Sequence, residues 1–217
     1  MKNRIINIIV FSLLLCSTAC TDFLTEETKS EMNTSQYFAT PDHARAAVNN
    51  LYRDGVPAFL DAGSAHYGAT IMLNGYLSGF YDNEFKGMSR EVRDCQTLQV
   101  TADGIASSLD KVWQNGYIAI ARANTVIKYI SNTPGLSSTE LQELLAQAKF
   151  FRAYNYLYLV KFFGDVPLIT EPYESLNDLY VARTASEEVY KQITDDLTEA
   201  ANGLKDACFT ENGFRVT

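Results

Sequence analysis

Side chains that could carry acid–base, nucleophilic or metal chemistry are few and scattered in this sequence. His43 and His66 are the only histidines, and no H-E-x-x-H motif or Cys/His cluster with zinc-ligand spacing is present. A G-x-S-x-G nucleophile elbow and a phosphate-binding P-loop are also missing. We therefore predict no catalytic residue, no metal and no cofactor.

Paired carboxylates, which a glycosidase needs on facing sides of a cleft, occur at three places in the predicted globular part, residues 37–217. Two of the pairs, Glu187 with Glu188 and Asp195 with Asp196, lie in a predicted helix, where adjacent residues do not face each other. Such pairs are typical of a solvated helix surface. The third pair is the loop pair Asp82 and Glu84, and it leaves a surface hydrolase open as an alternative.

The first residues predict export from the cytoplasm. The chain begins with Lys2 and Arg4, continues with an apolar run from Ile5 to Leu15, and reaches small residues before Cys20. A basic start, an apolar run of about 7–15 residues and a small-residue cleavage site define a secretory signal peptide. The run is too short to span a bilayer as a helix, which needs about 20 residues.

Cys20 is the residue whose surroundings predict a covalent modification. A cysteine directly after small residues at the cleavage point resembles a bacterial lipoprotein signal, and Cys20 follows Ala19 whereas Cys16 follows the bulky Leu15. We expect residues 1–19 to be a lipoprotein signal peptide and Cys20 to carry the lipid; a plain cleaved signal peptide is the alternative. Several acyl chains on one cysteine hold a protein stably on a membrane.

The composition indicates one acidic globular domain behind a polar tether. The chain has 18 Lys and Arg against 26 Asp and Glu, a net charge of −8, and removal of Lys2 and Arg4 with the signal peptide makes the balance more acidic. That charge argues against nucleic acid as a partner. Residues 20–36 are rich in Thr, Ser and Glu and read as a flexible tether.

Two cysteines remain in the predicted globular part, Cys95 and Cys208. In an oxidising compartment they could form a disulfide, and nothing in their spacing forbids it. The alternative is a pair of isolated, partly buried thiols.

Four helices are predicted from apolar periodicity and capping signals. The first begins with Thr40 as N-cap and Pro41 at the first helical position, and the second extends from about Ile105 to Ile130. Capping boxes at Ser137 and at Thr184 start the third and fourth helices, paired with Glu140 and Glu187. Short connections favour antiparallel neighbours, so we predict an all-α fold.

Residues 55–101 contrast with these helices because they contain several glycines and no regular apolar period. A long loop-rich insertion of this kind in a compact domain usually serves binding or irregular packing.

The third helix and its exit resemble the SusD/RagB family, the surface glycan-binding lipoproteins of Bacteroidetes. The preceding and following helices and the start at Cys20 are also similar to that family. The residues that carry the resemblance are Trp113, Tyr117, Ala123, Asn124, Phe150, Arg152, Tyr154, Tyr156, Gly164, Asp165, Pro167, Arg183, Tyr190, Ile193, Asp196 and Leu197.

The resemblance implies antiparallel helix pairs of the tetratricopeptide-like type and a role without catalysis. Family members lie on the outer membrane, anchored by lipid at the cell surface, where they bind an oligosaccharide or a peptide and deliver it to a TonB-dependent transporter. Because members are more than twice as long as this chain, residues 37–217 are expected to be the N-terminal helical part of a SusD-like domain. A short helical lipoprotein that docks a protein and binds no glycan is the alternative.

For the ligand site, the resemblance points to aromatic residues in the loop-rich insertion, since flat rings suit the apolar face of a sugar. No family motif fixes which rings take part, and each of them could instead be a packed loop aromatic. The predicted ligand-binding residues are Tyr67, Tyr76, Tyr81, Asp82 and Glu84, with Phe80 and Phe85 nearby.

Aromatic residues on the helices are predicted to be structural instead. Trp113 lies on an apolar helix face, and the tyrosines at 154, 156 and 158 fall on different faces of a buried helix. Arg152 in the same run needs a carboxylate or carbonyl partner, because a buried charge without one is costly.

Overall fold

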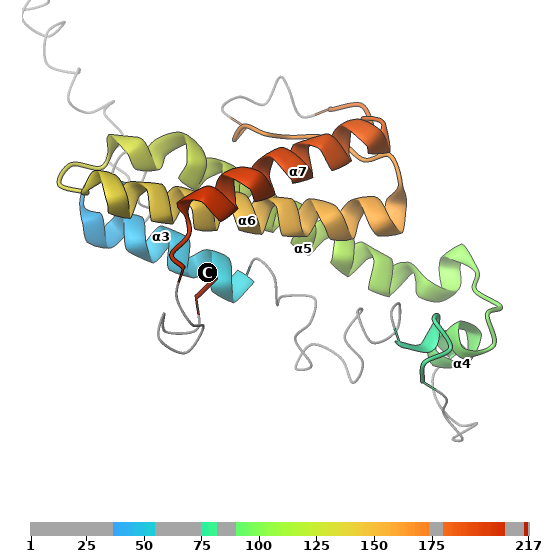
Figure 1. Cartoon of the computed structure of the whole chain (residues 1–217). Helices are drawn as coiled ribbons and strands as arrows, with labels where there is room; N and C mark the ends of the chain where they lie inside the picture. Colours follow the sequence, from blue (N-terminus) through green and yellow to red (C-terminus); the bar gives the residue numbers. More distant parts are fainter. Residues whose placement is uncertain (1–36, 55–74, 82–89, 174–179, 207–214, 217) are drawn as a thin grey trace, which may run out of the picture. The chain divides into compact units, whose positions relative to one another are not determined.

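The computed structural model describes residues 37–54, 75–81, 90–173, 180–206 and 215–216. The elements in these ranges are α3 (Pro41–Asp54), α4 (Arg90–Gln96), α5 (Ala102–Tyr129), η5 (Ile130–Asn132), α6 (Ser138–Phe163) and α7 (Ser186–Gly203) (Figure 1). No strand occurs in the described ranges, and the one β-type pairing there is an isolated antiparallel bridge between Val166 and Thr184. The all-α prediction is confirmed.

Helix α3 starts where the sequence predicts. The Thr40 hydroxyl accepts a hydrogen bond from the His43 N–H at 3.3 Å, and the Thr40 carbonyl accepts one from the Ala44 N–H at 3.1 Å. The side chains of Ala44, Val48 and Leu51 are fully buried, so the predicted apolar face packs inward.

Helix α5 begins at Ala102, three residues before the predicted start, because Thr101 caps it: the Thr101 hydroxyl accepts from the Gly104 N–H at 3.2 Å. Its partner is α6, against which it packs closely. A Cβ atom at Gly116 would lie 3.1 Å from Leu159 Cδ2, so the absence of a side chain at this position lets the two helices approach.

Helix α6 is the central element. It packs against α5 and α7, and more lightly against α3 (Figure 1). Ser137 caps it as predicted, since the Ser137 hydroxyl accepts from the Glu140 N–H at 3.2 Å. It ends at Gly164, whose φ of +67° favours glycine. Because neighbours cover several of its sides, α6 can be apolar nearly all round.

The predicted start of α7 is wrong by one residue, since the N-cap position is Ala185 and not Thr184. Thr184 does not cap the helix; its N–H donates to the Val166 carbonyl at 3.0 Å in the β-bridge, which holds it in extended backbone. The helix begins at Ser186, whose N–H donates to Asp165 Oδ1 at 2.9 Å. The acceptor at the N-terminus of α7 is therefore the Asp165 carboxylate, just after α6, and not a side chain of a local capping box.

A buried polar network fixes the segment that follows α6. Arg152 Nε and Nη2 donate to the two carboxylate oxygens of Asp196, both at 2.7 Å, and Arg152 Nη1 donates to Asn124 Oδ1 at 3.0 Å and to the Thr170 carbonyl at 3.1 Å. Asn124 in turn donates to the Ile169 carbonyl at 2.8 Å. The network joins α5, α6 and α7 to residues 169–170, and it confirms the prediction that Arg152 has a carboxylate partner.

Two tyrosines extend this anchoring. The Tyr156 hydroxyl donates to the Ile169 carbonyl at 2.9 Å and accepts from the Ile169 N–H, while the Tyr117 hydroxyl donates to the Pro167 carbonyl at 2.8 Å. Burial raises the pKa of both phenols. Trp113 packs edge-on against Phe163 with ring centroids 5.0 Å apart, in agreement with its predicted structural role.

The described residues form three apolar clusters along the helices. One joins α3 to α5 and α6, and a second joins α5, α6 and α7. The third lies where residues 75–81 and α4 pack against the N-terminal part of α5. Helix α4 lies in the insertion predicted to be loop-rich; at seven residues it is too short to show a helical period.

None of the helices in the described ranges is both long enough and apolar enough to span a bilayer.

Candidate functional site

The described part of the predicted ligand site is a tight turn over residues 75–81, which we call the aromatic turn. The Gly75 carbonyl accepts hydrogen bonds from the Phe80 N–H at 3.1 Å, the Tyr81 N–H at 3.3 Å and the Ser78 hydroxyl at 2.9 Å. Gly79 has a φ of +74°, a backbone conformation that favours glycine. Three donors on one carbonyl hold the end of the turn in a defined position.

Gly75 has a second role in the aromatic turn, because the Tyr81 ring lies directly against it. A Cβ atom at position 75 would be 2.2 Å from Tyr81 Cδ2 and 2.6 Å from Tyr81 Cε2, well inside van der Waals contact. Any larger residue would therefore displace the ring. Gly75, which the sequence indicates only as a loop glycine, therefore also leaves the space that the ring of the exposed Tyr81 occupies.

Tyr76 packs the aromatic turn against a buried apolar cluster. Its side chain is only 7% exposed and belongs to the apolar cluster that contains Val92, Cys95 and Ile105. The Tyr76 and Tyr81 ring centroids lie 6.1 Å apart at an interplanar angle of 63°, an edge-to-face arrangement. The structure thus assigns Tyr76 to packing, the alternative that the sequence left open for each loop aromatic.

The outer surface of the turn consists of two rings. Phe80 is 87% exposed and Tyr81 is 56% exposed. Exposed rings on a hydrogen-bonded turn lose little entropy on binding, and the Tyr81 hydroxyl adds a donor and an acceptor. This arrangement can stack on an apolar ligand face and hydrogen-bond its edge.

The other predicted site residues lie outside the described ranges. These are Tyr67, Asp82 and Glu84, together with Phe85 and the lipidation site Cys20. For them the sequence-based predictions stand as predictions. Cys95 is a buried free thiol in the cluster under the aromatic turn, and its burial raises the pKa of the thiol; Cys208 is outside the described ranges.

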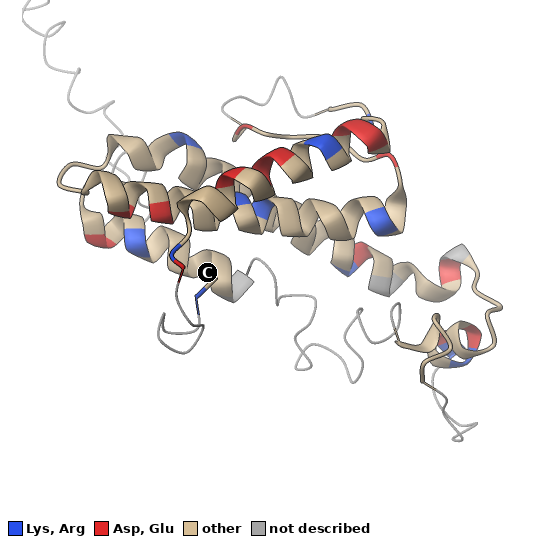
Figure 2. Cartoon of the chain, in the orientation of Figure 1, with Lys and Arg blue, Asp and Glu red and all other residues tan. Residues whose placement is uncertain are grey.

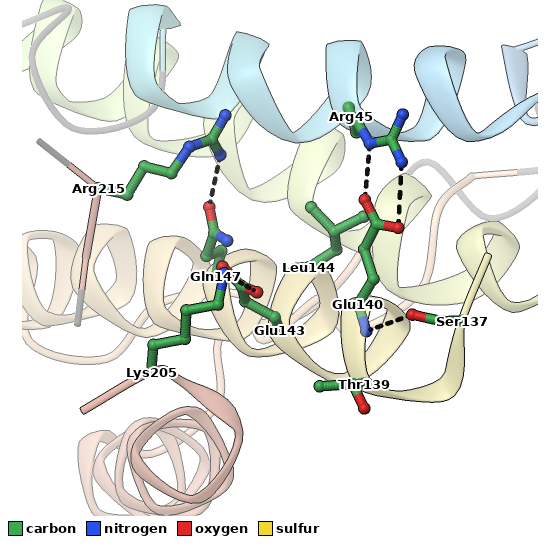
Figure 3. Close-up of a pocket in the computed structure, with 9 residues that line it drawn as sticks. All are labelled: Arg45, Ser137, Thr139, Glu140, Glu143, Leu144, Gln147, Lys205 and Arg215. Carbon is green, nitrogen blue, oxygen red and sulfur yellow. Dashed lines mark hydrogen bonds and ion pairs between the residues drawn. The ribbon is translucent and has the colours of Figure 1, made fainter. Parts of the chain in front are cut away.

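A second hollow, not foreseen from the sequence, lies between α3, α6 and the residues after α7. It is a groove of about 310 Å³ (Figure 3). It is lined by Arg45, Ser137, Thr139, Glu140, Glu143, Leu144, Gln147, Lys205 and Arg215. No local motif could have indicated it, because its lining comes from segments up to 170 positions apart.

The charged groups of the groove bond to one another. Arg45 Nε and Nη2 donate to the two carboxylate oxygens of Glu140 at 2.6 and 3.1 Å, and Lys205 pairs with Glu143 at 2.7 Å (Figure 3). Arg215 donates to Gln147 Oε1 at 3.1 Å and to Asn49 Oδ1 at 2.6 Å. We therefore interpret the groove as a polar clamp between segments.

The clamp has a pH-dependent part. The hydrogen bond from Arg45 lowers the pKa of the Glu140 carboxyl below its ordinary value. A lowered pKa in the folded state means that the unfolded chain binds the proton more readily. The stability that this pair contributes is therefore present above the ordinary glutamate pKa and is lost as the pH falls through the lowered one.

Within the described ranges, no group of three or more His, Cys, Asp or Glu side chains is placed to hold a metal ion.

Comparison with known proteins gives one family. Residues 22–217 match the model of the SusD-like family, which is described as starch-binding and associating with the outer membrane. SusD-like protein P2 of Formosa agariphila is 29% identical over 214 residues, which is 97% of this chain and 40% of that protein. The chain therefore spans about two fifths of the length of this curated relative.

Solved structures agree with this match. A SusD superfamily protein of Parabacteroides distasonis is 27% identical, with a TM-score of 0.65 over 83% of this chain and 36% of that one. A laminarin-binding SusD-like protein is similar in fold, with 24% identity and a TM-score of 0.66 over 83% of this chain and 38% of that one. The helix pairs are thus of the tetratricopeptide-like type that the resemblance implied.

Proposed function

The chain belongs to the SusD-like family, and from this premise we propose that it is the N-terminal helical part of a surface lipoprotein that binds oligosaccharides. The bound glycan, or in a variant of the same role a peptide, is delivered to a TonB-dependent outer-membrane transporter. The protein acts by capture and transfer and carries no catalytic residue. Cys20 provides the lipid anchor in the outer membrane.

The observation that carries this proposal is the aromatic turn. Gly75 leaves space for the Tyr81 ring, and the buried Tyr76 ring packs edge-to-face against it. Phe80 and Tyr81 remain exposed. Exposed aromatic rings offer a flat apolar surface, and the apolar face of a sugar ring matches that surface in shape and polarity. The neighbouring predicted residues Asp82 and Glu84 would supply acceptors for sugar hydroxyls.

The family supports a glucan as the first ligand to test. The family description names starch, and one structural neighbour is a laminarin-binding protein. Both polymers are uncharged. An uncharged ligand fits a chain with a net charge of −8, because an acidic protein repels anionic glycans.

Affinity electrophoresis of the mature chain in gels with starch or laminarin tests the proposal. We expect retardation by at least one of the two glycans, and a loss of about tenfold in affinity in Tyr81→Ala, because truncation of an anchoring aromatic residue costs more than about 1 kcal/mol. Tyr81→Phe keeps the ring and should bind nearly as the wild type does. Tyr190→Ala is the matched control, since Tyr190 is a tyrosine of similar exposure, 44%, on α7.

Gly75→Ala provides a second, independent variant. The added Cβ atom displaces the Tyr81 ring without removing it, so binding should weaken while the ring itself is still present. A chain that neither glycan retards, in wild type and variants alike, would contradict the proposal and favour the protein-docking module. Release of sugars from either polymer would instead revive the hydrolase alternative.

A further inference from the structure

Leu98 combines two features that are each unfavourable for a leucine. Its φ is +56°, in the left-handed region, and the residue is 66% exposed. A left-handed backbone is strained for residues that carry a Cβ atom. The other residues with positive φ in the described ranges are Gly79, Gly135 and Gly164. Leu98 is therefore the one residue in those ranges that keeps a side chain despite this strain.

The strain at Leu98 arises from the way in which α4 ends. The Gln99 N–H donates to the Asp94 carbonyl at 2.9 Å, and the Leu98 N–H donates to the Cys95 carbonyl at 3.2 Å. These two bonds form a Schellman motif, in which Leu98 has the position that glycine usually occupies. Glycine would make the same hydrogen bonds without strain, so the helix end does not explain a leucine.

Packing within the described chain does not explain the leucine either. The apolar contact that often accompanies a Schellman motif joins positions that here hold Gln99 and Asp94, two polar residues. Cys95 and Val100, on either side, belong to or pack against the apolar cluster under the aromatic turn, whereas Leu98 is largely exposed. Its side chain therefore adds little to the stability of the fold.

The position of Leu98 relates it to the proposed ligand site. Tyr76 of the aromatic turn belongs to the same apolar cluster as Cys95, the residue whose carbonyl holds the Leu98 N–H. The Tyr76 ring lies edge-to-face with the exposed ring of Tyr81. Leu98 is thus tied to the exposed ring through the packing under the turn, which lies beside α4 (Figure 1).

The surroundings of Leu98 match an uncharged polar ligand. Helix α4 carries two basic and two acidic residues (Figure 2), and both Arg90 and Arg93 pair with Asp94. A surface balanced in this way attracts neither an anionic lipid layer nor a highly charged partner. Next to Leu98, the amide of the exposed Gln99 offers donors and an acceptor to sugar hydroxyls.

We propose that Leu98 is a ligand-contacting residue, so that the glycan lies across Tyr81 and continues over the end of α4. This inference rests on the proposed function. Strained backbone at a retained side chain is typical of ligand contacts and other functional positions. The leucine covers the apolar face of a further sugar unit, and the Gln99 amide bonds its hydroxyls. The ligand is thus a linear oligosaccharide of several units.

Three substitutions separate the contact from the strain. Leu98→Ala removes the contact and keeps the strain, Leu98→Gly removes both, and Leu98→Met keeps an apolar side chain of similar size. In calorimetric titrations of the mature chain with laminarihexaose or maltohexaose, we expect the first two variants to bind about fivefold more weakly and Leu98→Met to bind as the wild type does. The Tm of Leu98→Gly should equal that of the wild type or exceed it by up to about 3 °C.

The control is Leu197→Ala, which truncates an exposed leucine on α7 and should leave glycan binding unchanged. Wild-type affinity in both Leu98→Ala and Leu98→Gly would overturn the inference and leave the proposed function intact, whereas a wild type that binds no glycan would overturn both. Weaker binding together with a lower Tm in Leu98→Gly would also overturn the inference, because the leucine would then act through the fold. Adsorption to phosphatidylglycerol vesicles that depends on Leu98, with unchanged glycan binding, would assign the side chain to a lipid surface instead.

Discussion

Arg152 is the residue at which the three long helices and the segment after α6 meet. Its side chain is 7% exposed and that of Asp196 is 2% exposed, and the two form a bidentate ion pair. Removal of one partner of such a pair leaves a buried charge without compensation, which makes the pair far more sensitive to mutation than a surface pair.

Arg152→Ala is therefore expected to destabilise the protein strongly, by about 3–5 kcal/mol. Arg45→Ala is the matched control, because Arg45 makes a bidentate pair with Glu140 of similar geometry but with 45% and 30% of the two side chains exposed. Exposed pairs contribute far less, because water and salt screen them. Urea unfolding of both variants measures the difference, and equal losses would contradict the account of the buried network.

At the residue scale, the sequence predicted the kind of contact that a residue needs better than it predicted which residue supplies that contact. That Arg152 requires a counter-charge follows from its apolar surroundings, but Asp196 lies 44 positions away and looked like half of a solvated acidic pair. Tyr76 and Tyr81 show the same limit. Both are loop tyrosines in sequence, and only the cluster under the turn makes one of them buried and the other exposed.

Asp165 shows how one element depends on another. It lies just after α6, and its carboxylate caps the first N–H of α7 across 21 positions of the sequence. Loss of an N-cap side chain costs about 0.5–2 kcal/mol. The cap also fixes where the segment between α6 and α7 returns to the helices.

We expect Asp165→Ala to lower the free energy of unfolding by about 1 kcal/mol, and Asp165→Asn to lower it much less, because asparagine caps helices about as well as aspartate. Ser186→Ala is the control, since Ser186 uses its backbone N–H and not its side chain for this bond. Thermal unfolding followed by circular dichroism gives all three values. An alanine variant as stable as the wild type would show that the bond does not cap α7 in solution.

Elements were predictable where the signals were local. Thr40, Ser137, Gly164 and the apolar periods placed α3 and α6 correctly and α5 within three residues. The start of α7 was missed because a β-bridge with Val166, a distant contact, takes Thr184 out of the helix. The aromatic turn lies in the segment that the sequence predicts to bind ligand, and its internal order depends on backbone hydrogen bonds that no apolar period reveals.

At the scale of the whole molecule, a helical scaffold carries an exposed aromatic turn, and a lipid is proposed to anchor it. The family match over residues 22–217 supports the scaffold, while the anchor is a prediction from the first residues of the sequence. The polar groove between α3, α6 and residues 205–216 was beyond sequence reasoning, because it forms only when segments from both ends of the described chain meet.

Cys20→Ser is expected to move the protein from the membrane fraction to the soluble exported fraction, because the lipid is the proposed anchor. Cys16→Ser is the matched control and should leave the protein in the membrane fraction. Detergent phase partition of cell fractions, with mass spectrometry of the mature N-terminus, provides the readout. Membrane retention of the Cys20 variant together with release of the Cys16 variant would assign the lipid to the other cysteine.

The central claim, that the ring of Tyr81 on its Gly75 seat contacts a glycan, is tested most directly by NMR of the mature chain labelled at its tyrosine rings. The Tyr81 signal is assigned as the one that disappears in Tyr81→Phe. The account predicts that titration with a laminarin or starch oligosaccharide shifts this signal saturably, while the signal of buried Tyr156 stays in place. Saturable glycan binding that leaves the Tyr81 signal unchanged would contradict it.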